Sequence, residues 1–318
     1  MYRLGIDLGG TNIVAGVVDE NYKIVGVAKT KTKLPRTADE IADDMAKVAK
    51  EAAAAAGITI NDIEALGVGT PGVAVPKTGT VVYSCNLGFN DVELGKMMSE
   101  RLGKDVYVEN DANAAAYGEY IAGAGRGTDN FIAITLGTGV GGGIIINGKI
   151  YSGSNFAGGE LGHTVIIDGG EICGCGRNGC WEAYASATAL IRQTKQAMIR
   201  YPESEMWGLC DGDINNVAGI TAFNAMRNGD AAGKMVVDRY IHYVAVGIAN
   251  MINIFQPDVI CIGGGISKEG DTLTLPIRKY VDGENYARNM KNTTVIKTAD
   301  LGNDAGIIGA AFLCDLYK

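Results

Sequence analysis

Short apolar runs alternate with amphipathic segments along most of the chain. Near the N-terminus, three apolar runs separated by polar turns predict β-strands at Arg3–Leu8, Ile13–Val18 and Lys23–Thr30. An alanine-rich segment of helical spacing follows, with Thr37 and Glu40 as a capping box and Gly57 as its stop. Strands and helices in this order indicate an α/β fold.

The same alternation continues to the C-terminus. Further strands are expected at Ala65–Gly69, Asp105–Glu109, Phe131–Leu136, Gly141–Ile146 and Val259–Ile262. Further helices are expected near Val92–Leu102, Ala112–Ala122, Glu182–Arg200, Asp230–Phe255 and Ala305–Leu316. Asp230 suits the N-cap of the longest of these helices, which Gln256-Pro257 should end.

The second half of the chain opens as the first does. A strand, a glycine turn and a second strand recur at an offset of about 128 residues, so that Leu8-Gly9 matches Leu136-Gly137. Chance is the alternative, but two related α/β domains facing a shared cleft explain the match more simply. We expect a smaller domain at residues 1–112 and a larger one at 113–302, with a C-terminal helix at about 303–318 packing back onto the first.

Composition narrows the class of protein. The 318 residues are 47% hydrophobic and include 46 glycines but only 6 prolines, which excludes collagen and disorder. The net charge of −8 argues against an electrostatic nucleic-acid binder. No secretory signal or confident membrane span is visible, so we expect a soluble, cytoplasmic protein.

Three glycine turns follow predicted strands and suit phosphate binding. The first is Asp7-Leu8-Gly9-Gly10-Thr11, where glycines with positive φ would let consecutive N–H groups form an anion-binding nest. Asp7 is a candidate for Mg²⁺, through water. The other two turns are Gly137-Thr138-Gly139 and Gly263-Gly264-Gly265. Ordinary hairpin turns are the alternative, and the turn at 137–142 leads into a strand, unlike a Walker or Rossmann loop.

A cysteine cluster indicates a metal. Cys173, Cys175 and Cys180 lie ten residues or more after His163, and three thiolates with one imidazole suit tetrahedral, structural Zn²⁺. Reduced surface thiols or a disulfide are the alternatives. The remaining cysteines are interpreted as small buried hydrophobes: Cys85, Cys210, Cys261 and Cys314.

Together these motifs resemble the ROK family, whose name abbreviates repressors, uncharacterised reading frames and sugar kinases. The matching segments are 7–11, 109–113, 136–143 and 159–163 with the cysteines that follow. The resemblance runs from Arg3 to about Phe312 and is strongest to bacterial-type ROK glucokinases. It implies two actin-like, ribonuclease-H-like domains around a central cleft, with ATP and Mg²⁺, a hexose as acceptor, and a dimer or tetramer.

The resemblance also implies roles for individual residues. Asp111 would be the general base on the sugar 6-hydroxyl, although its position alone also fits a helix N-cap. His163 would bind zinc through one ring nitrogen and the sugar through the other. Further sugar contacts are implied at Gly72, Asn86, Asn110, Glu160 and Glu182. ATP contacts are implied at Asp7, Gly9, Gly10, Thr11, Gly137, Thr138, Gly139, Gly264 and Gly265.

One zinc ion would tie the segment carrying Glu160 to the one carrying Glu182, and so preorganise a hexose pocket.

The alternatives to a glucokinase are a kinase for fructose or N-acetylmannosamine, and a non-catalytic sugar sensor or regulator. Asp111 and the phosphate turns speak against a sensor. A repressor is disfavoured because the phosphate strand begins at Arg3. The glycine excess is interpreted as marking turns near ligands, and Gly309 is included among those turns.

Overall fold

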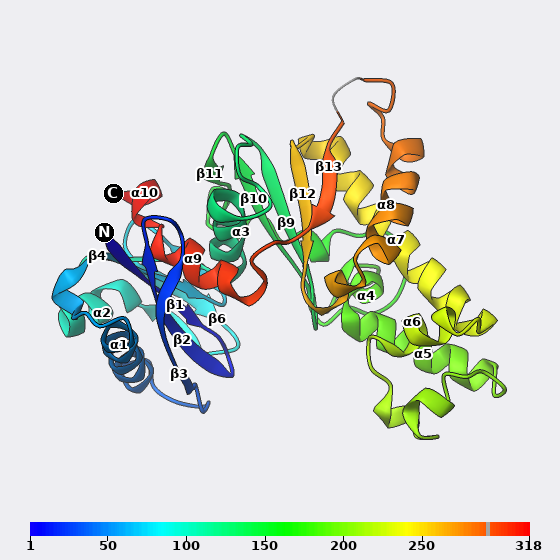
Figure 1. Ribbon diagram of the computed structural model, residues 1–318, viewed down its shortest axis with the longest axis horizontal. Coiled ribbons are helices and arrows are strands. Elements are labelled where there is room, and N and C mark those ends of the chain that lie inside the picture. The colour runs from blue at the N-terminus through cyan, green and yellow to red at the C-terminus, as the bar shows by residue number, and fades with distance from the viewer. Residues whose placement is uncertain (291–292) are drawn as a thin grey trace. The chain divides into compact units, whose positions relative to one another are not determined.

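Two five-stranded sheets share one strand order in the computed structural model, which describes residues 1–290 and 293–318 (Figure 1). The first has the order β3-β2-β1-β4-β8, and the second has the order β11-β10-β9-β12-β13. The first contains β1 (Tyr2–Leu8), β2 (Asn12–Asp19), β3 (Ile24–Lys31), β4 (Ile63–Thr70) and β8 (Val106–Asn110). The second contains β9 (Phe131–Leu136), β10 (Val140–Ile146), β11 (Lys149–Ile150), β12 (Val259–Gly263) and β13 (Val295–Thr298). The shared order confirms the internal repeat and the α/β fold.

Parallel pairing brings candidate residues to one edge of the first sheet. β1 pairs antiparallel with β2, whereas β1–β4 and β4–β8 are parallel. Asp7 is opposite Gly69, and Thr70 is opposite Asn110. The carboxyl ends of parallel strands meet at one edge, which is where ligands bind in open α/β sheets.

Alternating side chains give the first sheet two different faces. Leu4, Ile6 and Leu8 share a core with α1 (Ala38–Ala55) and α2 (Leu94–Leu102). Thr37 and Glu40 form the expected capping box, and Gly57 has φ +74°, as a helix stop requires.

Helix α9 (Ala305–Ala311) packs on the opposite face of the sheet, so closely that its backbone contacts the backbone of the strands. A Cβ on Gly5 would lie 1.9 Å from the Ile307 oxygen, and one on Gly67 would lie 1.9 Å from the Ala310 oxygen. Helix α3 (Asp111–Ala122) is equally close to α9, since a Cβ on Gly309 of α9 would lie 1.7 Å from the Ala114 oxygen of α3. The assignment of Gly309 to a ligand turn is therefore wrong: glycine is needed there for helix packing.

The C-terminal helix is interrupted, contrary to prediction. Phe312 and Leu313 donate to carbonyls three residues back, which tightens the backbone and separates α9 from α10 (Cys314–Tyr317). A small sheet of order β5-β6-β7 follows β4 and was not predicted: β5 (Val73–Val75), β6 (Thr80–Ser84) and β7 (Phe89–Val92).

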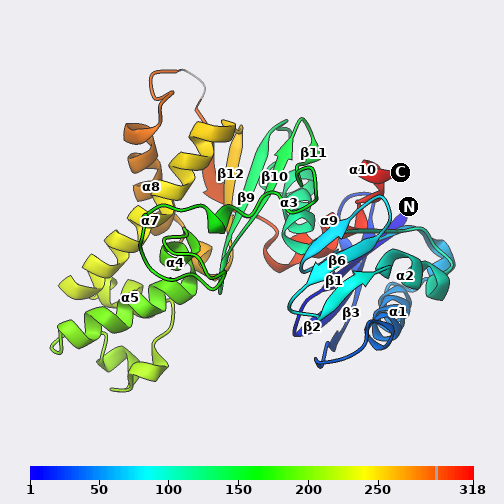
Figure 2. The same ribbon diagram turned by 180° about the vertical axis from the view of Figure 1, so that it is seen from behind.

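The remaining helices include α7 (Ala231–Phe255), capped by Asp230 as expected, and α6 (Thr221–Arg227) and α8 (Asp271–Glu284). The single helix expected at 182–200 is wrong. It is divided into α4 (Glu182–Ala185) and α5 (Ala187–Arg200), both of which contact α7 (Figure 2). The division falls at Ser186, whose backbone is extended and whose side chain accepts the Ala189 N–H to start a new helix. Short 3₁₀ helices occur at Ile60–Asp62, Leu161–His163, Gly208–Cys210, Ile214–Asn216, Gly265–Glu269 and Gly302–Asp304.

Contacts divide the chain into two compact units. The first comprises residues 1–133, 143–159 and 300–318, and the second comprises 134–142 and 160–299. The boundaries at 112 and 302 stay a prediction about which segments act as domains. Among the described helices, none combines the length and the apolarity needed to cross a membrane.

Candidate active site and metal centre

The first glycine turn lies at the end of β1. The Gly9 N–H donates to the Asn12 oxygen at 2.9 Å and closes the hairpin. The φ angles of Gly9 and Gly10 lie outside the left-handed region, so the expected positive φ is wrong at both. Gly10 is exposed, and a Cβ there would have Asn86 Cβ as its nearest neighbour, at 3.9 Å. The turn therefore offers accessible backbone, and Thr11 beside it is also exposed.

The second and third turns lie together in the second unit. Gly264 has φ +86°, and a Cβ there would lie 2.4 Å from the oxygen of Leu136, the residue before Gly137. Both Gly264 and Gly265 are exposed, as is Thr138 between Gly137 and Gly139. The structure thus places two of the proposed nucleotide turns side by side.

Glu182 contacts the second turn directly. Its Oε2 accepts the Val140 N–H at 3.0 Å, and a Cβ on Gly139 would lie only 2.3 Å from the same oxygen. Glycine at 139 therefore makes room for a carboxylate. This contact was not expected, because Glu182 was predicted to contact the sugar alone.

In the first unit, the strand-to-helix junction after β8 carries Asn110 and Asp111. The Asn110 Oδ1 accepts the N–H groups of Ala112 and Asn113, at 2.9 and 3.1 Å, and is the N-cap of α3. The N-cap alternative for Asp111 is therefore wrong, since Asn110 has that role. Asp111 is the first residue of the helix, half-buried, with Oδ1 accepting the Ala112 N–H at 2.8 Å.

The amide of Asn110 also fixes the loop after β4. Its Nδ2 donates to the Gly72 oxygen at 3.0 Å. Gly72 has φ +102°, and a Cβ there would lie 2.1 Å from the Tyr83 oxygen, so only glycine fits. The structure therefore joins two predicted sugar residues, Gly72 and Asn110, directly beside Asp111.

Two half-buried carboxyl groups interact at this edge of the sheet. Burial and, to a smaller extent, the negative charge of Asp111 raise the pKa of Asp7 to about 6. Burial also raises the pKa of Asp111. The hydrogen bond from the Ala112 N–H lowers this pKa, but the effect of burial is larger. A divalent cation would relieve the repulsion between the two groups, and oxygen ligands suit Mg²⁺. Asp7 could therefore hold Mg²⁺.

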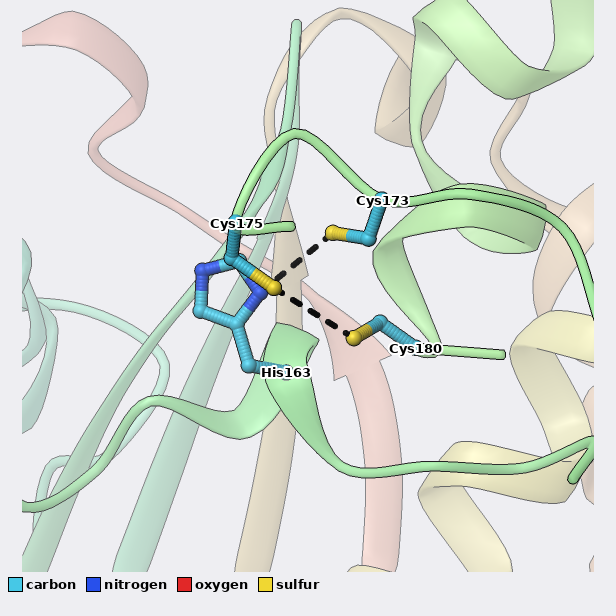
Figure 3. Close-up of side chains that lie close together, drawn as sticks. All are labelled: His163, Cys173, Cys175 and Cys180. Carbon is cyan, nitrogen blue, oxygen red and sulfur yellow. Dashed lines mark hydrogen bonds between the residues drawn. The ribbon is translucent and has the colours of Figure 1, made fainter. Parts of the chain in front are cut away.

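Four side chains converge in the second unit (Figure 3). The ligand atoms of His163, Cys173, Cys175 and Cys180 all lie within 4.8 Å of one another. The His163 Nδ1 is 3.6 Å from the Cys173 Sγ, and the sulfurs of Cys175 and Cys180 are 3.7 Å apart. None of the seven cysteines, all within the described residues, forms a disulfide.

These distances fit a tetrahedral zinc site. Zn–S bonds of about 2.3 Å place two sulfurs about 3.8 Å apart, and a Zn–N bond of about 2.0 Å places nitrogen and sulfur about 3.5 Å apart. All four positions are filled by protein, as in structural sites. The Nδ1 of His163 faces the cysteines, which leaves Nε2 for another partner.

The cysteine loop is anchored by Trp181. This fully buried residue donates its indole N–H to the Tyr243 oxygen at 2.8 Å, and it packs on Gly247, where a Cβ would lie 2.0 Å from the ring. Glu182 follows, with Oε1 3.5 Å from the Cys173 Sγ.

The four cysteines outside the cluster differ in burial. Cys85 is exposed, contrary to expectation, because it lies in the turn after β6. Cys210, Cys261 and Cys314 are buried as expected.

The comparison with known proteins identifies the family. The model of the ROK family matches residues 3–316. The chain belongs to the ROK family. The glucokinase of Streptomyces coelicolor is 39% identical over 98% of this chain and 96% of its own length, and that of Thermotoga maritima is 36% identical over 97% and 95%. A crystal structure of a ROK family glucokinase from Streptomyces griseus, in complex with glucose and AMPPNP, has 39% identity and a TM-score of 0.81, covering 98% of this chain and 99% of that one. The fold is the actin-like, two-domain fold of ROK sugar kinases.

In this ROK chain the predicted site residues form two groups, one in each unit. The first holds Asp7, Gly9, Gly10, Thr11, Gly72, Asn86, Asn110 and Asp111. The second holds Gly137, Thr138, Gly139, Glu160, His163, Glu182, Gly264, Gly265 and the three cysteines that lie beside His163. Glu160 is exposed and precedes the 3₁₀ turn that ends at His163.

Glu109 is a residue whose role sequence reasoning missed. It is 1% exposed and accepts three hydrogen bonds beside Asp111. An acidic residue at the end of an otherwise apolar strand was the available signal, since Val106–Val108 precede it.

Proposed function

We propose that the chain is a glucokinase that transfers the terminal phosphoryl group of ATP to the 6-hydroxyl of glucose. The chain is an ATP-dependent hexose kinase of the ROK family, similar over nearly its whole length to curated glucokinases. Glucose is the proposed acceptor because these relatives are glucokinases and the similar crystal structure contains glucose with AMPPNP.

Asp111 carries the proposed chemistry. Since Asn110 caps α3, the carboxylate of Asp111 is not needed as the cap and can accept a proton from the attacking hydroxyl. Its raised pKa makes it a stronger base than an exposed aspartate. As the proton moves to Asp111, the 6-oxygen bonds to the γ-phosphorus and the bond from that phosphorus to the ADP oxygen breaks.

The phosphate groups are proposed to contact the turns. The backbone N–H groups of Gly10, Thr11, Thr138 and Gly139 would donate to phosphate oxygens. Gly9 and Gly137, whose N–H groups close the two turns, would lie beside the phosphates, and Gly264 and Gly265 would lie against the adenosine. Asp7 would hold Mg²⁺, which neutralises negative charge on the transferred group.

The sugar contacts are proposed from both groups of residues. In the first unit, Asn110, Gly72 and Asn86 would bind hydroxyls. In the second, Glu160, Glu182 and the Nε2 of His163 would do so, with zinc on His163, Cys173, Cys175 and Cys180 holding the segments of Glu160 and Glu182 together. The predicted dimer or tetramer, cytoplasmic location and lack of a nucleic-acid partner stay predictions.

The test is ADP release with a panel of hexoses. Glucose should give the highest kcat/KM with ATP, above fructose, mannose and N-acetylmannosamine. Polyphosphate in place of ATP tests the donor. A preference for another hexose would overturn the choice of glucose, and phosphorylation of no sugar would favour a sensor instead.

A further inference from the structure

The buried carboxylate of Glu109 ties together three segments of the first unit. Its Oε1 accepts the backbone N–H of Asn110 at 2.8 Å and the side-chain amide of Asn113 at 3.1 Å. Its Oε2 accepts the hydroxyl of Tyr317 at 2.5 Å. The strand end, the first turn of α3 and the C-terminal helix α10 therefore meet at one side chain.

Asp111 lies between the two residues that the same oxygen binds. Asn110 precedes it in β8, and Asn113 follows it in the first turn of α3. Asn110 in turn caps the helix through its Oδ1. The direction in which the Asp111 carboxylate leaves the backbone is thus set by a junction whose two sides are both held by Glu109.

Tyr317 completes this arrangement from the other end of the chain. It is half-buried, 208 residues away in sequence, and donates to the oxygen of Glu109 that the amides leave available. Burial raises the pKa of both groups, so the tyrosine keeps its proton and remains a donor. Without this hydroxyl, a buried oxygen would lose its partner.

We propose that Glu109 and Tyr317 are positioning residues, which hold the first turn of α3 so that Asp111 meets the attacking hydroxyl. The inference rests on the proposed role of Asp111 as the base. Neither residue is among those proposed to contact sugar or ATP. Their main effect is on the orientation of Asp111, so their loss should lower kcat by a larger factor than it weakens glucose binding through Asn110.

Three variants remove all of these hydrogen bonds, one of them or none. Glu109→Ala should lower kcat on the order of 100-fold, because small displacements of a catalytic group are that costly. Tyr317→Phe should lower it by about tenfold. Glu109→Gln should stay within about threefold of the parent, because its oxygen can accept both amides and its amide can donate to the Tyr317 hydroxyl. In each folded variant, calorimetry should show unchanged stoichiometry and a loss of glucose affinity smaller than the loss of kcat.

Two further variants separate the possible failures. Thr37→Ala removes the cap of α1 in the same unit, and should lower Tm without lowering kcat. Asp111→Asn tests the underlying mechanism: if it retains near-normal kcat, the proposed base is wrong. If Asp111→Asn is inactive while Tyr317→Phe and Glu109→Ala both match the parent, or if Glu109→Gln is as impaired as Glu109→Ala, positioning through these hydrogen bonds is wrong.

Discussion

The carboxylate of Glu182 accepts a hydrogen bond from the backbone N–H of Val140, with 3.0 Å between the nitrogen and Oε2. Its other oxygen lies 3.5 Å from the Cys173 sulfur. One side chain therefore connects the turn proposed to bind phosphate with the cysteine cluster. A substitution that disturbs the cysteine cluster should therefore also disturb the turn, and the reverse should hold.

Glu182→Ala should raise KM for ATP as well as KM for glucose. The turn at Gly139 loses the acceptor that holds the Val140 N–H, and a hydrogen bond to a charged acceptor is worth about 1.5–3 kcal/mol, or roughly tenfold or more in affinity. Steady-state kinetics with each substrate varied in turn measures both effects. Glu171→Ala is the matched control, since this exposed glutamate of the same loop pairs only loosely with Arg192, at 3.9 Å. An unchanged KM for ATP would contradict the connection.

Cys175→Ser should reduce the zinc content and the thermal stability together. A ligand present at about 1,000 times its Kd adds about 4 kcal/mol to the free energy of unfolding, and weakening the site removes much of this. Metal analysis and thermal denaturation measure the two quantities, and a chelator should reproduce them in the parent along with loss of activity. Cys85→Ser, also exposed but outside the cluster, is the control and should keep the parent zinc content. Full activity and stability in zinc-free protein would rule out the structural role.

Asp111→Asn should lose between about 10² and 10⁴ in kcat, the range expected for removal of a general base. Glucose affinity should persist, because the cap of α3 belongs to Asn110 and not to Asp111. Single-turnover assays and calorimetry separate the two readouts. Loss of glucose binding with retention of kcat at saturation would reverse the assignment and make Asp111 a binding residue.

The stability of the protein should depend on pH through Glu109. Burial raises the pKa of this carboxyl in the native state above the value of about 4.3 found in unfolded chains. The native state then binds the proton more tightly, so Glu109 stabilises at low pH, and that contribution is lost as the pH rises through the raised pKa. As the pH is lowered from about 7 to about 4.5, the Tm of the parent should rise relative to that of Glu109→Gln. A constant difference in Tm would show that the pKa of Glu109 is not raised.

Features governed by local chemistry were predictable. The capping box of Thr37 and Glu40, the stop at Gly57 and the cap at Asp230 each depend on residues within one helical turn of each other. The cluster of three cysteines and His163 was also predictable, because the cysteines lie within eight consecutive residues and this set of side chains is typical of zinc sites.

Features that depend on residues far apart in the sequence were not predictable. Asn110 and Asp111 are both good capping residues, and only the structure shows which one accepts the amides. Nothing near Glu109 in sequence indicates a hydrogen bond to Tyr317. The backbone of Gly9 could not be deduced either, because the hairpin closes through Asn12 without a positive φ.

The glycines around α9 also affect how variants of this protein should be interpreted. At Gly5, Gly67, Gly118 and Gly309, any Cβ would lie about 2 Å or less from a backbone oxygen of a neighbouring element. A random mutagenesis library should therefore return no tolerated replacement at these four positions. Inactive clones there report on assembly of the first unit, and they should be set aside before a screen is used to map residues that act on ATP or sugar.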